Sequence, residues 1–204
     1  MHRPLIPTAA RALTAALLTF VLLLLAGSPV MAVEEPPFET VLSDPPFELR
    51  RYPGFVVAET LVEGGFDDAS RTGFRRVAGY IFGGNRDARG QSQRIAMTAP
   101  VTVEPDAGRW RLHFVMPPGT VFDTLPRPED ERVRLRQVDE HRMVAVRFSG
   151  FTTDASMRRE TQRLRDWAAG RGLTLTGEPQ VARYNDPFTL PWRRRNEILI
   201  RVAP

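Results

Sequence analysis

The chain has 204 residues and a formal net charge of +4, and its 28 basic residues are all arginine. The absence of cysteine excludes disulfides, thiol nucleophiles and thiolate metal sites, and the absence of lysine excludes Schiff-base chemistry. The 24 acidic residues are interleaved with the arginines, which argues against a nucleic-acid partner, because nucleic-acid-binding proteins cluster their basic residues.

Residues 1–32 have the pattern of an export signal. Arg3 and Arg11 form a positive start, residues 12–26 form a leucine-rich apolar core, and cleavage is expected after Ala32. The core is shorter than the roughly 20 residues that span a bilayer. We therefore expect a cleaved signal and a periplasmic or secreted protein without stable membrane insertion. An uncleaved segment that anchors the chain to the inner membrane is the alternative.

The first half of the remaining chain predicts strands around one helix. Residues 33–46 are expected to form an extended lead-in to a single domain over 47–204. Asp67 or Asp68 is expected to cap the helix, which continues to about Phe82. Alternating, β-branched stretches predict five strands: 47–52, 55–63, 95–104 with an interruption at Pro100, 110–116 and 132–138.

The same order recurs in the second half. A strand at 143–148 precedes a helix that begins at Thr153 or Asp154 and ends near Gly170. Three further strands are predicted at 173–176, 180–184 and 197–202. The recurrence indicates a duplicated strand-strand-helix-strand-strand unit. Because most connections are too short for parallel crossovers, the sheet should be largely antiparallel, which gives an α+β fold.

Several blocks of the sequence resemble the SOUL heme-binding protein family. They are Glu48-Leu49-Arg50-Arg51-Tyr52, Gly73-Phe74 through Tyr80-Ile81, Arg94 through Val101, Arg147-Phe148-Ser149-Gly150 and Arg194-Arg195-Asn196-Glu197. The resemblance covers about residues 47–202. It implies a distorted antiparallel β-barrel of about eight strands, flanked by two helices, that binds heme or a related porphyrin.

No residue pattern in the sequence indicates catalysis or an iron ligand. There is no HExxH, no GxSxG and no recognisable carboxylate pair, so we expect a binding protein and not an enzyme. His113 and His141 each lack a second ligand at a useful spacing, and both are expected to face solvent. In some SOUL proteins a proposed heme-ligating histidine precedes the first-strand tyrosine. Here that position is Arg51, which cannot donate a lone pair to iron.

The expected heme site is therefore an apolar groove beside the first helix. Its predicted wall comprises Phe74, Val77, Ala78 and Ile81 on the helix, with Met97 and Phe188 from loops. Arg71 and Arg194 are the predicted partners of the heme propionates, since a guanidinium matches a carboxylate. The alternatives are that the apolar residues form ordinary core and that the arginines are solvated or paired with acids.

Two further expectations concern the last strand and the class of ligand. Asn196 and Glu197 are expected to fix the last strand and not to contact a ligand. A general module that binds amphiphilic or aromatic small molecules in the same groove is the second hypothesis. Carrying, buffering or sequestering a tetrapyrrole would be the cellular role under the first hypothesis.

Overall fold

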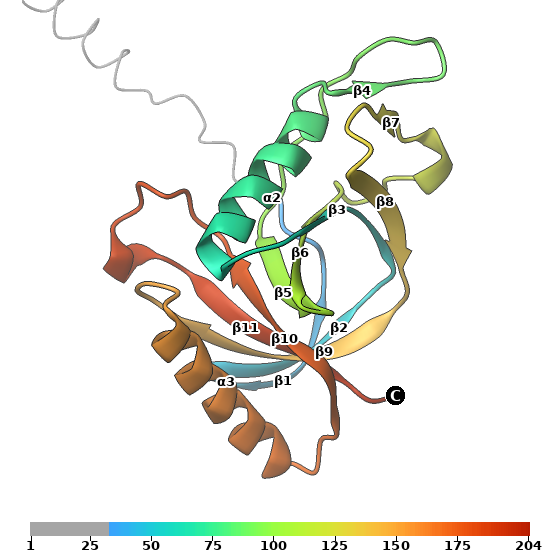
Figure 1. The fold of residues 1–204 in the computed structure, drawn as a ribbon. Helices are drawn as coiled ribbons and strands as arrows, with labels where there is room; N and C mark the ends of the chain where they lie inside the picture. The colour runs from blue at the N-terminus through green and yellow to red at the C-terminus, as the bar shows by residue number, and fades with distance from the viewer. Residues whose placement is uncertain (1–32) are drawn as a thin grey trace, which may run out of the picture. The chain divides into compact units, whose positions relative to one another are not determined.

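The computed structural model describes residues 33–204 (Figure 1). The predicted export signal, residues 1–32, lies outside the described residues. Among residues 33–204, no helix is long and apolar enough to cross a membrane. Two α-helices, α2 (Phe66–Ile81) and α3 (Asp154–Ala169), accompany a large antiparallel sheet. The predicted α+β class is thus confirmed.

The large sheet has nine strands in the order β1-β2-β9-β11-β10-β5-β6-β3-β8, and every neighbouring pair is antiparallel. The strands are β1 (Glu39–Asp44), β2 (Phe47–Tyr52), β3 (Phe55–Val62), β5 (Val101–Asp106), β6 (Arg109–Val115), β8 (Val133–Val138), β9 (His141–Phe148), β10 (Leu175–Arg183) and β11 (Asn196–Val202). A two-stranded sheet joins β4 (Asn85–Arg86) to β7 (Arg127–Pro128). Since β1 and β8 stand at the two ends of the strand order, closure into a barrel stays a prediction.

The strand order is symmetric about the pair β5–β10. On one side of that pair follow β6, β3 and β8, and on the other side follow β11, β9 and β2. The helix α2 lies in the chain between β3 and β5, and α3 lies between β9 and β10. Both halves therefore contain the same unit in the same arrangement, as the predicted duplication requires.

The two faces of the sheet have different partners. Both helices pack on one face, where Val77 and Ile81 of α2 and Leu164 of α3 join the main hydrophobic core. The opposite face has smaller apolar clusters, one around Tyr52 and Leu199 and another around Val57, Val115 and Val138. Consecutive residues of β6, β9 and β11 are consequently buried on both sides of the sheet.

The N-terminal cap that the sequence predicted is observed in α3 but not in α2. Thr153 caps α3 as predicted, because its Oγ1 accepts a hydrogen bond from the backbone N–H of Ser156 at 3.2 Å. The helix α2 instead begins after Gly65 without a side-chain cap. The predicted caps Asp67 and Asp68 lie within its first turn, where a negative charge interacts favourably with the helix dipole.

Three strand predictions are corrected by the structure. The strand predicted at 95–104 begins only at Val101, so residues 95–100 lie outside it. The lead-in contains β1, whose six residues are all exposed and pair with β2 at the edge of the sheet. An exposed edge strand has no alternating apolar pattern, so nothing in the residues marked it. The strands predicted at 173–176 and 180–184 are one strand, β10, with a register shift at a positive-φ glycine, Gly177.

Candidate ligand-binding site

Large apolar side chains are partly exposed on α2 and just after its end. Phe74 and Phe82 are separated by two helical turns and are 39% and 53% exposed. Met97 is 42% exposed in the loop that follows α2. The backbone N–H of Ile95 donates to the carbonyl of Ile81 at 2.9 Å, which holds this loop against the end of the helix. We call Phe74, Phe82 and Met97 the α2 surface.

The predicted helical wall is divided between this surface and the core. Phe74 is partly exposed, and its ring lies 5.7 Å from the ring of Phe114 between centroids. Val77 and Ile81 have almost no exposed area and pack in the main core, while Ala78 is nearly buried. Val77 and Ile81 therefore belong to the core, as the alternative interpretation of the helix expected. Contact of Val77, Ala78 or Ile81 with a ligand stays a prediction.

The two predicted propionate partners are both engaged with the protein. Arg71 forms an ion pair with Asp68, and both side chains are about three-quarters exposed. Arg194 donates through Nε to the carbonyl of Thr189 and through Nη2 to that of Pro187, each at 2.8 Å. Phe188 projects from this loop and is 94% exposed. Arg194 therefore shapes the loop that presents Phe188, and Arg71 is the more accessible cation.

Three contacts join segments that are far apart in the sequence. Arg183, at the end of β10, donates to Ser70 Oγ at 2.9 Å on the first turns of α2. Thr98 forms a parallel bridge with Glu34. Arg195 binds the neighbouring Glu35 with N–O distances of 2.8 and 3.1 Å. Only the first of these contacts involves α2, and the other two join residues 34–35 to the segments before β5 and β11.

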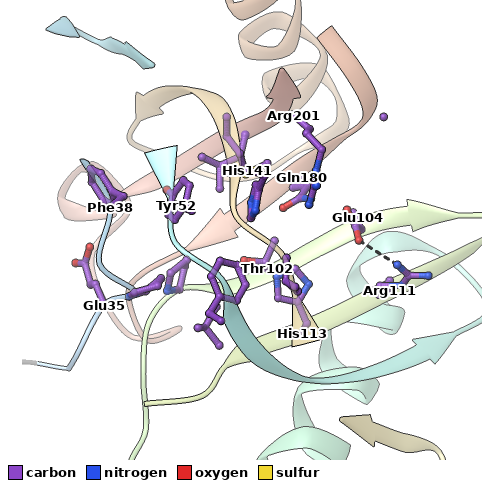
Figure 2. Close-up of a pocket in the computed structure, with 18 of the residues that line it drawn as sticks. Glu35, Phe38, Tyr52, Thr102, Glu104, Arg111, His113, His141, Gln180 and Arg201 are labelled. Carbon is purple, nitrogen blue, oxygen red and sulfur yellow. Dashed lines mark ion pairs between the residues drawn. The ribbon is translucent and has the colours of Figure 1, made fainter. Parts of the chain in front are cut away.

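A hollow of about 250 Å³ opens on the sheet face opposite to the helices (Figure 2). Phe38 and Tyr52 lie at one end of it, and the ion pair of Glu104 with Arg111, 3.6 Å between Oε1 and Nη1, lies at the other. His113 and His141 line the space between them. We call this hollow the strand-face pocket. No pattern in the sequence indicated this pocket.

His113 is the most unusual residue of the strand-face pocket. It is 7% exposed, which corrects the expectation that it faces solvent, and its Nδ1 has no hydrogen-bond partner among the described residues. Burial, with the charges of Arg136, Arg111 and His141, lowers the pKa of His113 to about 3. The imidazole is therefore neutral at pH 7. The residues that cover His113 come from strands distant in sequence, so its burial is a tertiary property.

A buried ion pair stands beside the pocket. Glu197 accepts from Arg50 Nη1 at 2.6 Å and from Arg50 Nη2 at 3.1 Å, and it also binds Arg195 and the Tyr184 hydroxyl. Burial alone would raise the pKa of Glu197, but the hydrogen bonds and charges of Arg50 and its neighbours hold that pKa below its ordinary value. The predicted structural role of Glu197 agrees with this position. Asn196 likewise donates to the carbonyl of Gly150 at 3.0 Å.

Comparison with known proteins places this geometry in a family. The model of the SOUL heme-binding protein family matches residues 33–201. The chain belongs to the SOUL heme-binding family. Within it, the chain is 26% identical to heme-binding protein 1 of Xenopus laevis over 159 residues, which is 74% of this chain and 81% of that protein. It is 28% identical to heme-binding protein 2 of Mus musculus, over 84% of this chain and 87% of that one.

Solved structures share the SOUL fold at low sequence identity. The C-terminal domain of EcmrR superposes with a TM-score of 0.58 at 13% identity, over 81% of this chain and 98% of that domain. A hydrolase from Listeria innocua superposes with a TM-score of 0.52 at 14% identity, over 76% and 91% of the two chains. At these identities the likeness concerns the fold alone.

The SOUL ligand can be compared with the residues present. The exposed rings and thioether of the α2 surface suit the flat apolar faces of a heme. No group of three or more metal-ligating side chains occurs among the residues that the structure describes. Both histidines of residues 33–204 line the strand-face pocket, on the other side of the sheet from α2. The α2 surface therefore fits the macrocycle but supplies no imidazole to its iron.

Proposed function

We propose that this SOUL protein is an exported, non-catalytic protein that holds heme or a related tetrapyrrole against the α2 surface. The macrocycle would lie against Phe74, Phe82 and Met97, and its propionates would face Arg71. Arg194 would act by ordering the loop that carries Phe188. The protein would carry, buffer or sequester the tetrapyrrole in the periplasm or outside the cell.

The exposed apolar area on α2 carries this proposal. Large side chains such as Phe74 and Phe82 are normally removed from water, because each buried apolar Å² contributes about 25 cal/mol. A bound macrocycle would cover both rings at once. Soluble proteins that expose a contiguous apolar patch commonly use it for binding. Affinity would come mainly from this burial, with Arg71 fixing the orientation of the ligand.

The strand-face pocket is the less suitable place for a tetrapyrrole. Its volume of about 250 Å³ lies below the roughly 300–1,000 Å³ of pockets that enclose drug-sized ligands. A macrocycle with propionate groups would have to open the sheet to enter. The open side of α2 has no such limit on ligand size. This contrast favours the α2 surface even though the pocket contains His113 and His141.

The export part of the proposal rests on residues 1–32. Their arginines, apolar core and Ala32 site have the pattern of a cleaved signal. Absence of cysteine and lysine, with no catalytic motif in the sequence, supports a binding role. Retention by an uncleaved segment at the inner membrane is the alternative location. Fractionation of cells that express the tagged chain, with N-terminal sequencing, separates these outcomes.

A heme titration of the full chain tests the proposal. Saturable binding at micromolar protein is expected, with an absorption spectrum that lacks the sharp bands of six-coordinate bis-histidine heme. Metal-free protoporphyrin should bind with similar affinity, since apolar burial and propionate pairing do not need iron. Absence of saturable binding would refute a tetrapyrrole function, and a strong preference for the iron form would refute binding without a protein ligand.

A general amphiphile-binding role is the second candidate. The α2 surface is open and apolar, and these features do not select a porphyrin over another flat anionic molecule. Competition of heme with anionic aromatic dyes distinguishes the two functions. A tetrapyrrole carrier should bind heme far more tightly than any dye of the panel, whereas an amphiphile-binding module should show similar affinities across it.

A further inference from the structure

We propose that a patch of exposed apolar side chains on two loops docks this protein reversibly on an anionic phospholipid surface. The patch comprises Phe151, between β9 and α3, and Phe188, Leu190 and Trp192, between β10 and β11. We call these four residues the loop patch. Docking would be peripheral, with the rings in the headgroup region of the bilayer. The inference does not rest on tetrapyrrole binding.

The loop patch contains the most exposed large apolar side chains of residues 33–204. Phe188, Trp192 and Phe151 are 94%, 69% and 60% exposed, which are the three highest values of this class. Leu190, between the first two in sequence, is 47% exposed. Exposed apolar patches on soluble proteins commonly mark sites that bind a protein or a membrane. The loop patch is therefore a candidate docking surface.

The two loops are joined to each other. The backbone N–H of Gly150 donates to the carbonyl of Pro191 at 2.9 Å. The guanidinium of Arg194 lies 5.2 Å from the centre of the Phe151 ring, and it donates to the two carbonyls that flank Phe188 in sequence, each at 2.8 Å. Figure 1 shows both loops at the same end of the described chain, the shorter in light orange and the longer in red. The apolar side chains are thus presented from one end of the domain.

The longer loop is held in shape by its own polar groups. The carboxylate of Asp186 accepts hydrogen bonds from the backbone N–H groups of Phe188 and Thr189 at 2.8 and 3.0 Å. The backbone N–H of Arg195 donates to Asn185 Oδ1 at 2.6 Å. A loop fixed in this way loses little conformational entropy when it meets a partner. The exposure of its apolar side chains is therefore part of the loop structure.

The residue types of the loop patch suit the interface of a lipid bilayer. Phenylalanine and leucine are apolar, and tryptophan combines an apolar ring with an N–H that favours the headgroup level. Such residues beside arginines are typical of protein segments that lie in the membrane interface. None of the four lines the strand-face pocket or the hollow that Met157 and Val181 line. Protruding rings of this kind fit a soft surface that they can enter one by one.

The charges beside the loop patch favour an anionic surface. Residues 149–153 are uncharged, with one arginine before them and one aspartate after them, and residues 184–195 contain three arginines and one aspartate, Asp186. One of these arginines is bound to two glutamates. Arg194 donates to backbone carbonyls, and Arg193 is exposed and forms no ion pair within residues 33–204. Two cations therefore remain against a single acid.

The N-terminal end of the described chain also lies at the base of the longer loop. Glu35 binds Arg195 with N–O distances of 2.8 and 3.1 Å. Glu35 follows residue 26, the end of the apolar core of the predicted signal, by nine residues, which span at most about 30 Å. An uncleaved signal in the inner membrane would therefore keep the loop patch near the headgroups. A cleaved signal would leave docking to the loop patch alone.

Tryptophan fluorescence tests the proposal at the loop patch itself, because residues 1–32 contain no tryptophan. Of the three tryptophans, Trp167 is buried and Trp110 is half-buried, whereas Trp192 is exposed. Vesicles of brominated phosphatidylglycerol should quench Trp192 in the full chain, with half of the effect at about 0.1–1 mM lipid. Trp192→Phe keeps a ring in the patch and should still bind these vesicles, but without the quenching. Absence of quenching at saturating lipid, or quenching that persists in Trp192→Phe, would overturn the proposal.

Two further substitutions, each with a matched control, are measured by the same titration. Phe151→Ser should raise the lipid concentration for half-quenching about tenfold, whereas Val121→Ser, at a residue 59% exposed between β6 and β7, should not change it. Arg193→Gln should raise it about fivefold with brominated phosphatidylglycerol and leave it unchanged with brominated phosphatidylcholine. Arg75→Gln removes an exposed arginine of α2 and should have no effect. Equal effects within either pair would overturn the assignment to the loop patch.

A second copy of the chain and the α2 surface are the competing explanations. Sedimentation equilibrium of the full chain without lipid should show no association through the loop patch. Self-association that Phe151→Ser abolishes would assign the patch to an interface between copies and overturn the membrane assignment. Phe74→Ser alters the α2 surface and should leave the quenching of Trp192 unchanged. Loss of quenching in that variant would show that the α2 surface, and not the loop patch, docks on lipid.

Discussion

The guanidinium of Arg50 and the carboxylate of Glu197 form a two-pronged ion pair in which both side chains are at least 95% buried. Arg50 belongs to β2 and Glu197 to β11, and both strands pair with β9 between them. The pair therefore crosses over a central strand. Removing two charges from water costs several kcal/mol, which complementary geometry and further hydrogen bonds from Tyr184 and Arg195 offset here.

Loss of one partner should be strongly destabilising. Glu197→Gln leaves the buried guanidinium of Arg50 without its charge partner, and we expect the free energy of unfolding to fall by about 3–5 kcal/mol. Urea denaturation followed by circular dichroism measures this change. Glu39→Gln is the control, because Glu39 pairs with Arg51 at the exposed edge of the sheet, where about 0–1 kcal/mol is expected. Equal losses in the two variants would contradict the role given to burial.

Stability should fall in mild acid because of His113. Its pKa is about 3 in the folded chain and 6.5 when unperturbed, so below pH 6.5 the unfolded state binds a proton that the folded state does not. Unfolding is thereby favoured by about 2 kcal/mol between pH 7 and pH 5. His113→Leu should lose this part of the pH dependence. The smaller part from His141, whose pKa is also lowered by burial, should remain. An identical pH profile in the variant would refute this explanation.

The α2 surface can be tested with a pair of substitutions matched in exposure. Phe74→Ser removes a ring that is 39% exposed and should weaken heme binding about tenfold, by loss of buried apolar area. Leu42→Ser alters a residue that is 40% exposed on β1 and should leave heme affinity unchanged. Both affinities are measured by heme absorbance. If both variants bind equally, the macrocycle does not lie on α2.

Charge on α2 should change heme affinity in opposite directions at neighbouring residues. Arg71→Glu should weaken heme binding several-fold, because a propionate would meet a negative charge. Asp68→Asn frees Arg71 from its ion pair and should strengthen binding. Neither change should alter stability by more than about 1 kcal/mol, since the pair is exposed. Binding to protoporphyrin dimethyl ester, which lacks propionate charges, should be insensitive to both substitutions.

Placing a histidine at Arg51 distinguishes two sites for the iron. Arg51 lies on β2, which pairs with β1 and β9, whereas α2 packs on β3 and β6. If heme lies on α2, Arg51→His should change neither the heme affinity nor the absorption spectrum. A new low-spin spectrum in this variant would place the iron near β2 and contradict the proposed site. The substitution should be stable, because Arg51 is about half exposed.

The sequence predicted most of the regular structure because its signals were local. The alternation in residues 47–52 gave β2 with its observed bounds, and the Thr153 cap gave the start of α3. The helical period also selected Val77 and Ile81 as one apolar face, but that face could equally serve a core or a groove. Only the packing of α2 on β6 assigns it to the core.

The strand-face pocket could not be predicted because its lining is assembled from strands distant in sequence. Tyr52, His113 and His141 come from β2, β6 and β9, and their approach depends on the curvature of the sheet. The lack of a hydrogen-bond partner at His113 Nδ1 within residues 33–204 is also invisible in the sequence, because it depends on the positions of all neighbouring groups. The duplication, by contrast, could be recognised from the order of elements.

The symmetric strand order has a consequence for how the protein unfolds. In sequence β2 belongs to the first half, yet it pairs with β9 of the second, and β8 of the second half pairs with β3 of the first. The outer strand of each half is thus paired with a strand of the other half. Neither half keeps a complete sheet when alone, so we expect one cooperative transition in place of two. Fragments cut within the loop between β6 and β7 should regain structure only when mixed.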